Sequence, residues 1–454
     1  MQHSPELLLP AGSLAKMHTA FDYGADAVYA GQPRYSLRAR NNEFSTVANL
    51  ATGITEAHAR GKQFYVASNI FAHNAKLKTY LADMAPVIAL KPDALIMADP
   101  GLIMLVRDKW PDVPVHLSVQ ANAINWADVK FWQRMGLTRV ILSRELSLDE
   151  IEEIRQTCPE MELEVFVHGA MCIAYSGRCL LSGYFNHRDP NQGTCTNSCR
   201  WDYKVKNSNE DVSGEIIEVP VETLQFNYQQ ALEQANDSFS SLGDMPRHPL
   251  ADRTYMLEES QRPGQLLPIM EDEHGTYIMN SKDLRAVEHI ERLVKIGVSS
   301  LKIEGRTKSI YYVARTAQIY RSAIDDAVAG RPFDMSLLGS LQGLANRGYT
   351  DGFYQRHSTH DHQNYMSGAS ELNNSHYVGD VQSVTDGWAD ILVKNRFSVG
   401  DQIEVIHPRG NQIVTLEQMK SAKGEAITVA PGSGHQVRIP LDARYDKALL
   451  ARLL

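Results

Sequence analysis

The sequence predicts an α/β fold, a TIM-like (β/α)8 barrel followed by a small all-β C-terminal domain. Two observations predict it. Eight short apolar runs, most of which end in a polar residue or glycine, alternate with amphipathic stretches over the larger part of the chain. From about residue 376 this pattern gives way to alternating strands separated by turn signals, which is typical of a small barrel or sandwich.

The eight runs are rich in aliphatic and β-branched residues, as buried parallel strands are. Between them lie stretches with helical spacing, such as 147–158, where Leu148, Ile151 and Ile154 share one face. Eight such βαβ units close a barrel whose active site lies at the carboxyl ends of the strands. An open doubly wound sheet is the alternative, but no G-x-G-x-x-G follows the first run. The predicted strands are 6–12, 25–31, 63–69, 93–99, 115–121, 139–145, 163–169 and 300–306.

Changes in charge and polarity along the chain predict the domain boundaries. Residues 207–275 carry 14 acidic and three basic residues, whereas the whole chain has a formal charge of −9. We expect an irregular, largely exposed insertion there, between the seventh and eighth strands. The barrel is predicted over 1–335 and includes this insertion, the polar stretch 336–370 is predicted as a linker, and the β domain covers 371–454.

The amino terminus has no basic segment followed by an apolar one, so we expect no signal peptide. No run of about 18 apolar residues is present, which predicts no transmembrane helix and no membrane partner. We therefore expect a cytoplasmic protein in a reducing compartment, where structural disulfides are rare. Clustered cysteines in such a protein are metal ligands or redox groups.

Four of the five cysteines follow the seventh predicted strand with the spacing C-x6-C-x15-C-x3-C. Structural zinc sites use paired short knuckles, and only the second pair fits that pattern. Irregularly spaced thiolates on a loop rich in turn residues favour an iron–sulfur cluster, while zinc and four free thiols remain alternatives. The fifth cysteine, Cys158, is predicted to be a small hydrophobic residue in the preceding helix. The predicted ligands are Cys172, Cys179, Cys195 and Cys199.

Basic and polar residues follow several predicted strands, and in a barrel these positions converge on one mouth. Guanidinium groups bind carboxylates in a bidentate manner, so an anionic substrate is expected there. His116, Ser118 and Gln120 alternate on one face of the fifth run, and a polar face inside a barrel indicates a ligand. Lys302 and Glu304 share a face, which an internal ion pair would explain equally well. The candidate substrate-binding residues are Arg34, Arg38, Asn69, Gln120, Arg144, Lys302, Glu304 and Arg306.

His168 and Glu164 are the candidate catalytic residues. His168 precedes the first cysteine of the cluster by four residues and could donate or accept a proton. Glu164 lies four residues before His168, and because side chains alternate along a strand, both are predicted on the same face. A peptidase reading, with Cys172 as nucleophile beside His168 and Glu164, is possible. It leaves the other three cysteines without a role.

The stretch EVFVHGAMCIAYSGRCLLS at 164–182 resembles the signature of peptidase family U32, the collagenase-like peptidases. The likeness extends to YGADAVYAGQPRYSLRARNNEF (23–44) and LKIEGRTKSIYYVARTAQIYR (301–321), and is greatest with the branch that hydroxylates tRNA. The resemblance implies a TIM-like barrel with a small β domain and a 4Fe–4S cluster on the four cysteines. It also implies oxygen-independent formation of 5-hydroxyuridine at the tRNA wobble position, with prephenate as hydroxyl donor.

A tRNA anticodon loop as partner requires positive surface, although the pI of about 6.0 argues against general nucleic-acid binding. Residues 178–206 hold five basic and two acidic groups, and residues 302–321 hold five basic and one acidic group. Aromatic residues within the first of these segments could stack on an unpaired base, or pack around the cluster. An iron–sulfur protein that binds RNA without catalysis is therefore an alternative.

Overall fold

The computed structural model describes residues 4–32, 34–36, 43–170, 283–305, 308–344, 349–355 and 375–453. Between 203 and 278 it describes the backbone of five strands. The statements below concern these residues. The segments 37–42, 171–202 and 306–307, which carry the four clustered cysteines, Arg38 and Arg306, lie outside them.

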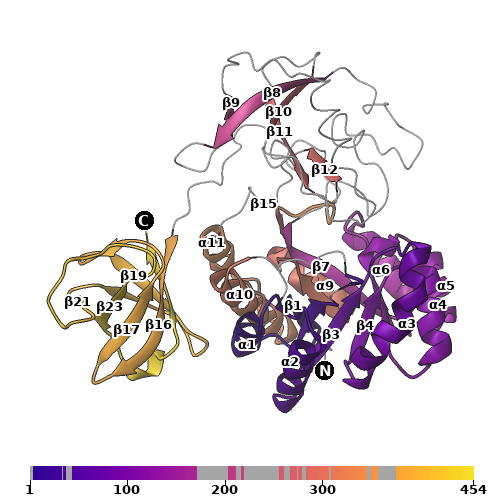
Figure 1. Ribbon diagram of the computed structural model, residues 1–454, viewed down its shortest axis with the longest axis horizontal. Coiled ribbons are helices and arrows are strands. Elements are labelled where there is room, and N and C mark those ends of the chain that lie inside the picture. Colours follow the sequence, from indigo (N-terminus) through magenta and orange to yellow (C-terminus); the bar gives the residue numbers. More distant parts are fainter. Residues whose placement is uncertain are drawn as a thin grey trace, which may run out of the picture.

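Eight parallel strands close into a barrel, which confirms the predicted fold class (Figure 1). β1 pairs with β2 on one side and with β14 on the other, and β14 pairs in turn with β7, so the sheet has no open edge along its eight parallel members. All eight predicted apolar runs form these strands. They are β1 (Glu6–Pro10), β2 (Ala27–Gly31), β3 (Gln63–Ser68), β4 (Ala94–Met97), β5 (Val115–Leu117), β6 (Arg139–Ile141), β7 (Glu162–Ala170) and β14 (Ser300–Ile303).

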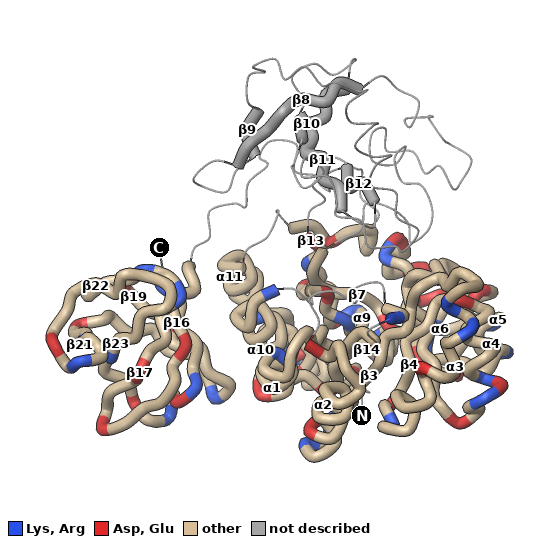
Figure 2. The backbone as a smooth tube through the Cα atoms, viewed as in Figure 1, with Lys and Arg blue, Asp and Glu red and all other residues tan. Residues whose placement is uncertain are grey.

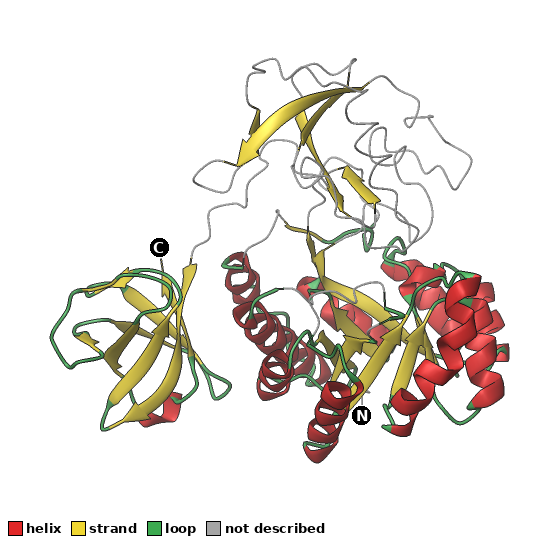
Figure 3. Ribbon diagram, viewed as in Figure 1, coloured by secondary structure: helices red, strands yellow, loops and turns green. Residues whose placement is uncertain are grey.

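Helices cover the outside of the barrel (Figure 3). Their starts follow local capping chemistry: Ser147 and Glu150 form a reciprocal capping box at α6, and the Asp99 side chain accepts from two backbone amides at α4. No helix among the described residues is long and apolar enough to cross a membrane. The helices are α1 (Leu14–Asp22), α2 (Val47–Ala59), α3 (Asn74–Ala89), α4 (Pro100–Lys109), α5 (Trp126–Arg134), α6 (Leu148–Thr157), α9 (Ile290–Ile296) and α10 (Ile310–Val328).

The acidic insertion is not irregular throughout, contrary to the prediction. The chain between β7 and β14 contains an antiparallel sheet in the order β12-β11-β10-β8-β9. Its acidic and amide-rich composition concealed short apolar runs, such as LLPIM, that suffice for strand pairing. The strands are β8 (Tyr203–Glu210), β9 (Ile216–Glu218), β10 (Tyr255–Glu259), β11 (Leu266–Asp272) and β12 (Gly275–Ile278).

The stretch predicted as a linker begins as part of the barrel domain. Helix α11 (Ser336–Gln342) contacts α10, and β15 (Tyr349–Thr350) pairs with β13 (Asp283–Arg285), which lies antiparallel to the end of β7. The buried Leu341 and Leu344 belong to the barrel core. Residues 336–344 and 349–355 are therefore packed structure, and the polar composition of 336–370 as a whole hid these apolar positions.

The C-terminal domain is all-β, as predicted. Seven strands form one sheet in the order β20-β19-β24-β16-β17-β23-β21, and β18 pairs with β22. The sheet encloses its own hydrophobic core, which includes Phe397, Ile391 and Leu450. The strands are β16 (Ser375–Thr385), β17 (Trp388–Val393), β18 (Phe397–Ser398), β19 (Gln402–Ile406), β20 (Gln412–Thr415), β21 (Lys420–Ser421), β22 (Val429–Ala430), β23 (Gln436–Pro440) and β24 (Leu449–Leu453).

Helix α10 joins the two domains through buried polar contacts. The Arg315 guanidinium donates two hydrogen bonds, of 2.9 and 2.8 Å, to the Glu404 carboxylate. The Tyr311 and Tyr377 rings stack with their centroids 5.0 Å apart. From α1, the Tyr23 hydroxyl donates to the backbone oxygen of Ile406 at 3.0 Å. Bidentate Arg–carboxylate pairs fix orientation as well as distance, so this pair orients the β domain against α10.

Candidate functional site

The interior of the barrel is charged, whereas most TIM-like barrels fill it with aliphatic residues. The centre is Glu164 of β7, which is fully buried. Its carboxylate accepts a hydrogen bond of 2.7 Å from the Lys302 ammonium of β14 and one of 3.2 Å from the Arg139 guanidinium of β6. Buried charges are costly unless paired and hydrogen-bonded, and here the Glu164 carboxylate has a cationic partner on each side.

The lower part of the network involves the first residue of β1. Arg139 donates to the Glu6 carboxylate at 2.7 Å, and its Nε donates to Glu162 at 2.8 Å. The hydroxyl of Ser300 also donates to Glu6, at 2.8 Å. The Tyr65 hydroxyl donates to the same carboxylate, and burial together with the Glu6 charge raises the pKa of Tyr65. These groups lie at the amino-terminal end of the strands and close the floor of the barrel.

The upper part of the network lies toward the carboxyl ends of the strands. The Lys302 ammonium lies 4.3 Å from the Tyr29 ring centroid, and the Arg144 guanidinium lies 3.8 Å from that of Phe166. The Tyr29 hydroxyl donates to the Glu304 carboxylate at 3.0 Å. Lys302 and Glu304 thus face the interior, as predicted, but the ion-pair partner of Lys302 is Glu164.

Asn69 and Gln120 also lie near the strand ends. The Asn69 amide donates to the Ser118 hydroxyl at 3.4 Å, which links the ends of β3 and β5. The predicted alternation of the fifth run breaks after Leu117, because Ser118 caps a short 3-10 helix, η1 (Val119–Ala121). Gln120 is therefore on this helix and not on a strand, and His116 is the member of the predicted polar face that points into the barrel.

His168 and Glu164 do not share a strand face, so the predicted alternation is wrong at this point. A β-bulge shifts the register of β7 against β14: Phe166 pairs with Lys302, but His168 pairs with Ile303. The extra residue turns His168 outward, where it packs against Tyr312 and Tyr320 of α10. His168 and Glu164, which a peptidase would need on one side of the strand, therefore lie on the two opposite faces of β7.

The next residue explains why the strand can bend here. Gly169 has a φ of +103°, and a Cβ atom there would collide with the backbone oxygen of Glu304. Only glycine tolerates both constraints. Gly169 lies directly before the segment that carries the clustered cysteines. Its close contact with Glu304 holds this end of β7 against the end of β14.

The buried imidazole of His168 predicts acid sensitivity. Burial, with smaller contributions from Lys308 and Arg285, lowers the pKa of His168 from 6.5 to about 3. Between these values the unfolded chain binds more protons, so the free energy of unfolding falls as the pH falls from 6.5 toward 3. The loss is at most about 1.4 kcal/mol per pH unit.

Urea denaturation between pH 7 and pH 4 measures this effect. We expect the His168→Phe variant, which keeps an aromatic ring in the same space, to lose stability less steeply than the wild type over this range. Parallel curves for the two proteins would contradict the assignment of a neutral, buried His168.

Arg34 is described and lies at the surface. Its guanidinium pairs with Asp83 of α3 at 2.6 Å, and 57% of its side chain is exposed. It does not contact the interior network. A role for Arg34 in binding a carboxylate stays a prediction, as do the roles of Arg38, Arg306, Cys172, Cys179, Cys195 and Cys199, which lie outside the described residues.

The basic segment 302–321 does not form a positive surface from its described members. Lys302 is buried beside Glu164, Arg315 binds Glu404, and Arg321 pairs with Asp26 and Asp325. Charges of both signs are mixed along the barrel helices and the β domain (Figure 2). Lys308 pairs with Asp283 at 3.8 Å, and Arg306 lies outside the described residues. A count of charges along the sequence cannot show which of them the fold neutralises.

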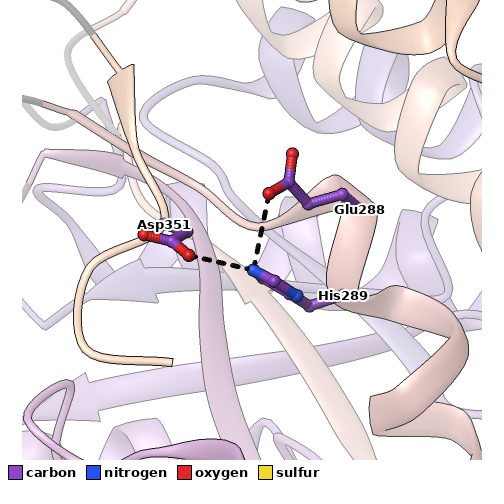
Figure 4. Close-up of side chains that lie close together, drawn as sticks. All are labelled: Glu288, His289 and Asp351. Carbon is purple, nitrogen blue, oxygen red and sulfur yellow. Dashed lines mark hydrogen bonds and ion pairs between the residues drawn. The ribbon is translucent and has the colours of Figure 1, made fainter. Parts of the chain in front are cut away.

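A separate cluster ties β15 to the barrel (Figure 4). The Nε2 atom of His289, in η5 (Val287–His289), lies 3.3 Å from an oxygen of Asp351 and 3.6 Å from one of Glu288. The three side chains could surround a cation. The His289 ring also packs on Tyr354, whose hydroxyl donates to the backbone oxygen of Phe166, so the cluster has a clear structural role beside β7.

Three residues of the interior network escaped the sequence analysis. Glu6, Tyr65 and Arg139 lie at or near the starts of apolar runs, where charged residues are common strand boundaries. A usable signal was present, because Arg139, Glu162 and Glu164 are charged residues at inward positions of neighbouring strands. Only the barrel register brings them together.

Cys158 is buried, as predicted. It caps the end of α6 with 2% of its surface exposed, and burial raises the pKa of its thiol.

The fold and this interior define a TIM-like barrel protein with a charged interior and a fused β domain. The family model for peptidase family U32 matches residues 12–364, and that for the family's C-terminal domain matches residues 373–452. The chain belongs to peptidase family U32.

Named relatives are similar over nearly their full length. tRNA hydroxylation protein P of Escherichia coli is 60% identical over 99% of this chain and 96% of the relative. The protein of the same name from Haemophilus influenzae is 56% identical over 100% of this chain and 97% of the relative. Among solved structures, the U32 peptidase Mk0906 is 18% identical, covers 43% of this chain and 84% of its own, and has a TM-score of 0.33.

Proposed function

We propose that this chain is a tRNA-modifying enzyme that hydroxylates the wobble uridine of the anticodon loop to 5-hydroxyuridine. The reaction is independent of oxygen and takes its hydroxyl group from prephenate. The similarity to two proteins named for tRNA hydroxylation, at 60% and 56% identity over nearly the whole chain, carries this proposal. Peptidase activity has no comparable support, because His168 and Glu164 lie on opposite faces of β7.

A 4Fe–4S cluster on Cys172, Cys179, Cys195 and Cys199 is part of the proposal. Four thiolates are the donor set that such clusters prefer. The first of them follows Ala170 by two positions in the sequence, and Ala170 is the last residue of β7. A cluster bound there would supply a redox centre next to the mouth.

The barrel interior supports a small anionic co-substrate. Prephenate carries two carboxylates, and two cations lie in the upper part of the described network: Lys302 over the Tyr29 ring and Arg144 over the Phe166 ring. In the arrangement that we propose, Arg144 binds one carboxylate with its planar fork. Lys302, held by Glu164, provides a second positive charge whose position does not depend on the ligand.

The test is anaerobic reaction of the purified, cluster-loaded protein with unmodified tRNA and prephenate. Mass spectrometry of the nucleosides should show a uridine heavier by one oxygen atom, only when prephenate is present. Absence of this product from a fully loaded preparation would refute the proposed function.

Arg144→Ala tests the anion site in the same assay. Loss of one charged hydrogen-bonding partner costs about 1.5–3 kcal/mol, so the KM for prephenate should rise roughly 10- to 150-fold with a much smaller change in kcat. Arg292→Ala, which removes an exposed pair with Asp149 on the outer helices, is the matched control and should behave as the wild type. If Arg34→Ala raised the KM and Arg144→Ala did not, the anion site would lie at Arg34.

A further inference from the structure

Among the described residues, a histidine faces the interior of the barrel. His116 of β5 is 95% buried, with 5% of its surface exposed. Its ring packs edge-on against the ring of Tyr65, with the centroids 4.8 Å apart. The charges of Arg139 and Lys302 act on it from β6 and β14, so groups from three other strands surround the imidazole.

These neighbours form their hydrogen bonds with Glu6 and Glu164, and none of these bonds involves His116. The Tyr65 hydroxyl donates to Glu6, Arg139 binds Glu6, and Lys302 binds Glu164. The Nδ1 atom of His116 has no hydrogen-bond partner among the described residues. A buried polar atom without a partner costs about 1–3 kcal/mol, and native proteins leave few of them unsatisfied. The interior therefore holds a buried hydrogen-bonding atom that none of the described residues satisfies.

His168 offers a contrast. Its Nε2 atom also lacks a described partner, but it lies on the outer side of β7, enclosed by Tyr312, Tyr320 and Tyr349. His116 thus faces the interior of the barrel, whereas His168 faces away from it. The sequence suggested His168 as a proton donor or acceptor, but of the two histidines it is His116 that faces the interior.

We propose that His116 is a substrate-binding residue whose imidazole hydrogen-bonds a hydroxyl group of the small co-substrate inside the barrel. This inference rests on the proposed function, in which the carboxylates of the same molecule face Lys302 and Arg144.

The electrostatics explain why a hydroxyl, rather than a carboxylate, is the partner. Burial, followed by the charges of Arg139 and Lys302, lowers the pKa of His116 well below 6.5. The facing groups, Tyr65 and the paired Glu6 and Glu164 included, leave the imidazole neutral near pH 7. A neutral imidazole has one donor and one acceptor nitrogen, which matches a hydroxyl group and gives a carboxylate no charge to bind.

Calorimetric binding of two probes tests the proposal: prephenate, and its 4-deoxy analogue, which keeps both carboxylates but lacks the ring hydroxyl. We expect His116→Phe to weaken prephenate binding roughly 5- to 100-fold, because the ring keeps its packing on Tyr65 but loses its hydrogen bond. The analogue should bind the variant and the wild type equally. His116→Asn, whose amide lies near the position of Nδ1, should recover most of the affinity for prephenate.

His58→Ala is the matched control, since His58 is exposed at the end of α2, near the start of β3 and away from the mouth. Unchanged prephenate binding by His116→Phe would overturn the inference, and so would equal weakening of both probes. If His116→Phe did not fold, the imidazole 15N signals of the wild type would decide: prephenate should shift those of His116, and unchanged signals would overturn the inference. Failure of the wild type to bind prephenate would instead refute the co-substrate of the proposed function.

Discussion

Serine variants of Cys172, Cys179, Cys195 and Cys199, each purified anaerobically, are expected to lose iron and tRNA hydroxylation together. A hydroxyl group is a poor replacement for a thiolate on iron, so one substitution leaves the whole cluster labile. The wild type should contain about four irons and four acid-labile sulfides per chain. Iron analysis and mass spectrometry of tRNA nucleosides measure the two losses on the same preparations.

Cys158→Ser is the internal control, because this thiol is buried against the backbone oxygen of Trp126 and lies outside the cluster sequence. It should keep its iron. Loss of activity in the Cys172 variant alone, with iron retained in the other three, would favour a single nucleophile and a peptidase. Stoichiometric zinc in protein from iron-replete cells would contradict the cluster.

Glu164→Gln is expected to destabilise the protein strongly. The amide keeps the size of the side chain but removes the charge. The buried Lys302 then loses its counterion, and Arg139 loses one of its carboxylate partners. Removal of one partner from a buried ion pair typically costs about 3–5 kcal/mol. Urea denaturation at pH 7 measures the change in the free energy of unfolding.

Two further variants serve as controls for this stability measurement. Arg292→Ala breaks an exposed ion pair and should cost less than about 1 kcal/mol. The double variant Glu164→Gln with Lys302→Met removes the unpaired ammonium and should recover part of the loss, because the effects of contacting residues are not additive. A cost below 1 kcal/mol for Glu164→Gln would show that the interior is open to water.

The barrel was predictable because its signal is local. Each of the eight strands is a short apolar run, and Ser147 with Glu150 marks a helix start within four residues. The direction of His168 was not predictable, since the bulge that turns it outward arises from pairing with β14, which is more than a hundred residues away. Arg315 shows the same limit: only the fold reveals that Glu404 neutralises it.

The candidate site was predicted in part for a similar reason. Lys302, Glu304 and Arg144 were found because strand ends converge in any barrel. Glu6 and Tyr65 were missed because their importance depends on Arg139, which reaches them across the barrel from another strand. The inward position of a charged residue can be read from the sequence, but its partner cannot.

The pairing of β14 with both β1 and β7, which closes the barrel, has a consequence for synthesis on the ribosome. β1 emerges first, yet its second neighbour, β14, follows β7 only after residues 171–299 have been made. At a translation rate of about 10 residues per second, β7 keeps an unpaired edge for roughly 13 s and β1 for roughly 30 s. Exposed strand edges are sites of aggregation. The nascent chain is therefore expected to depend on chaperones in this interval, and more so when translation is slow.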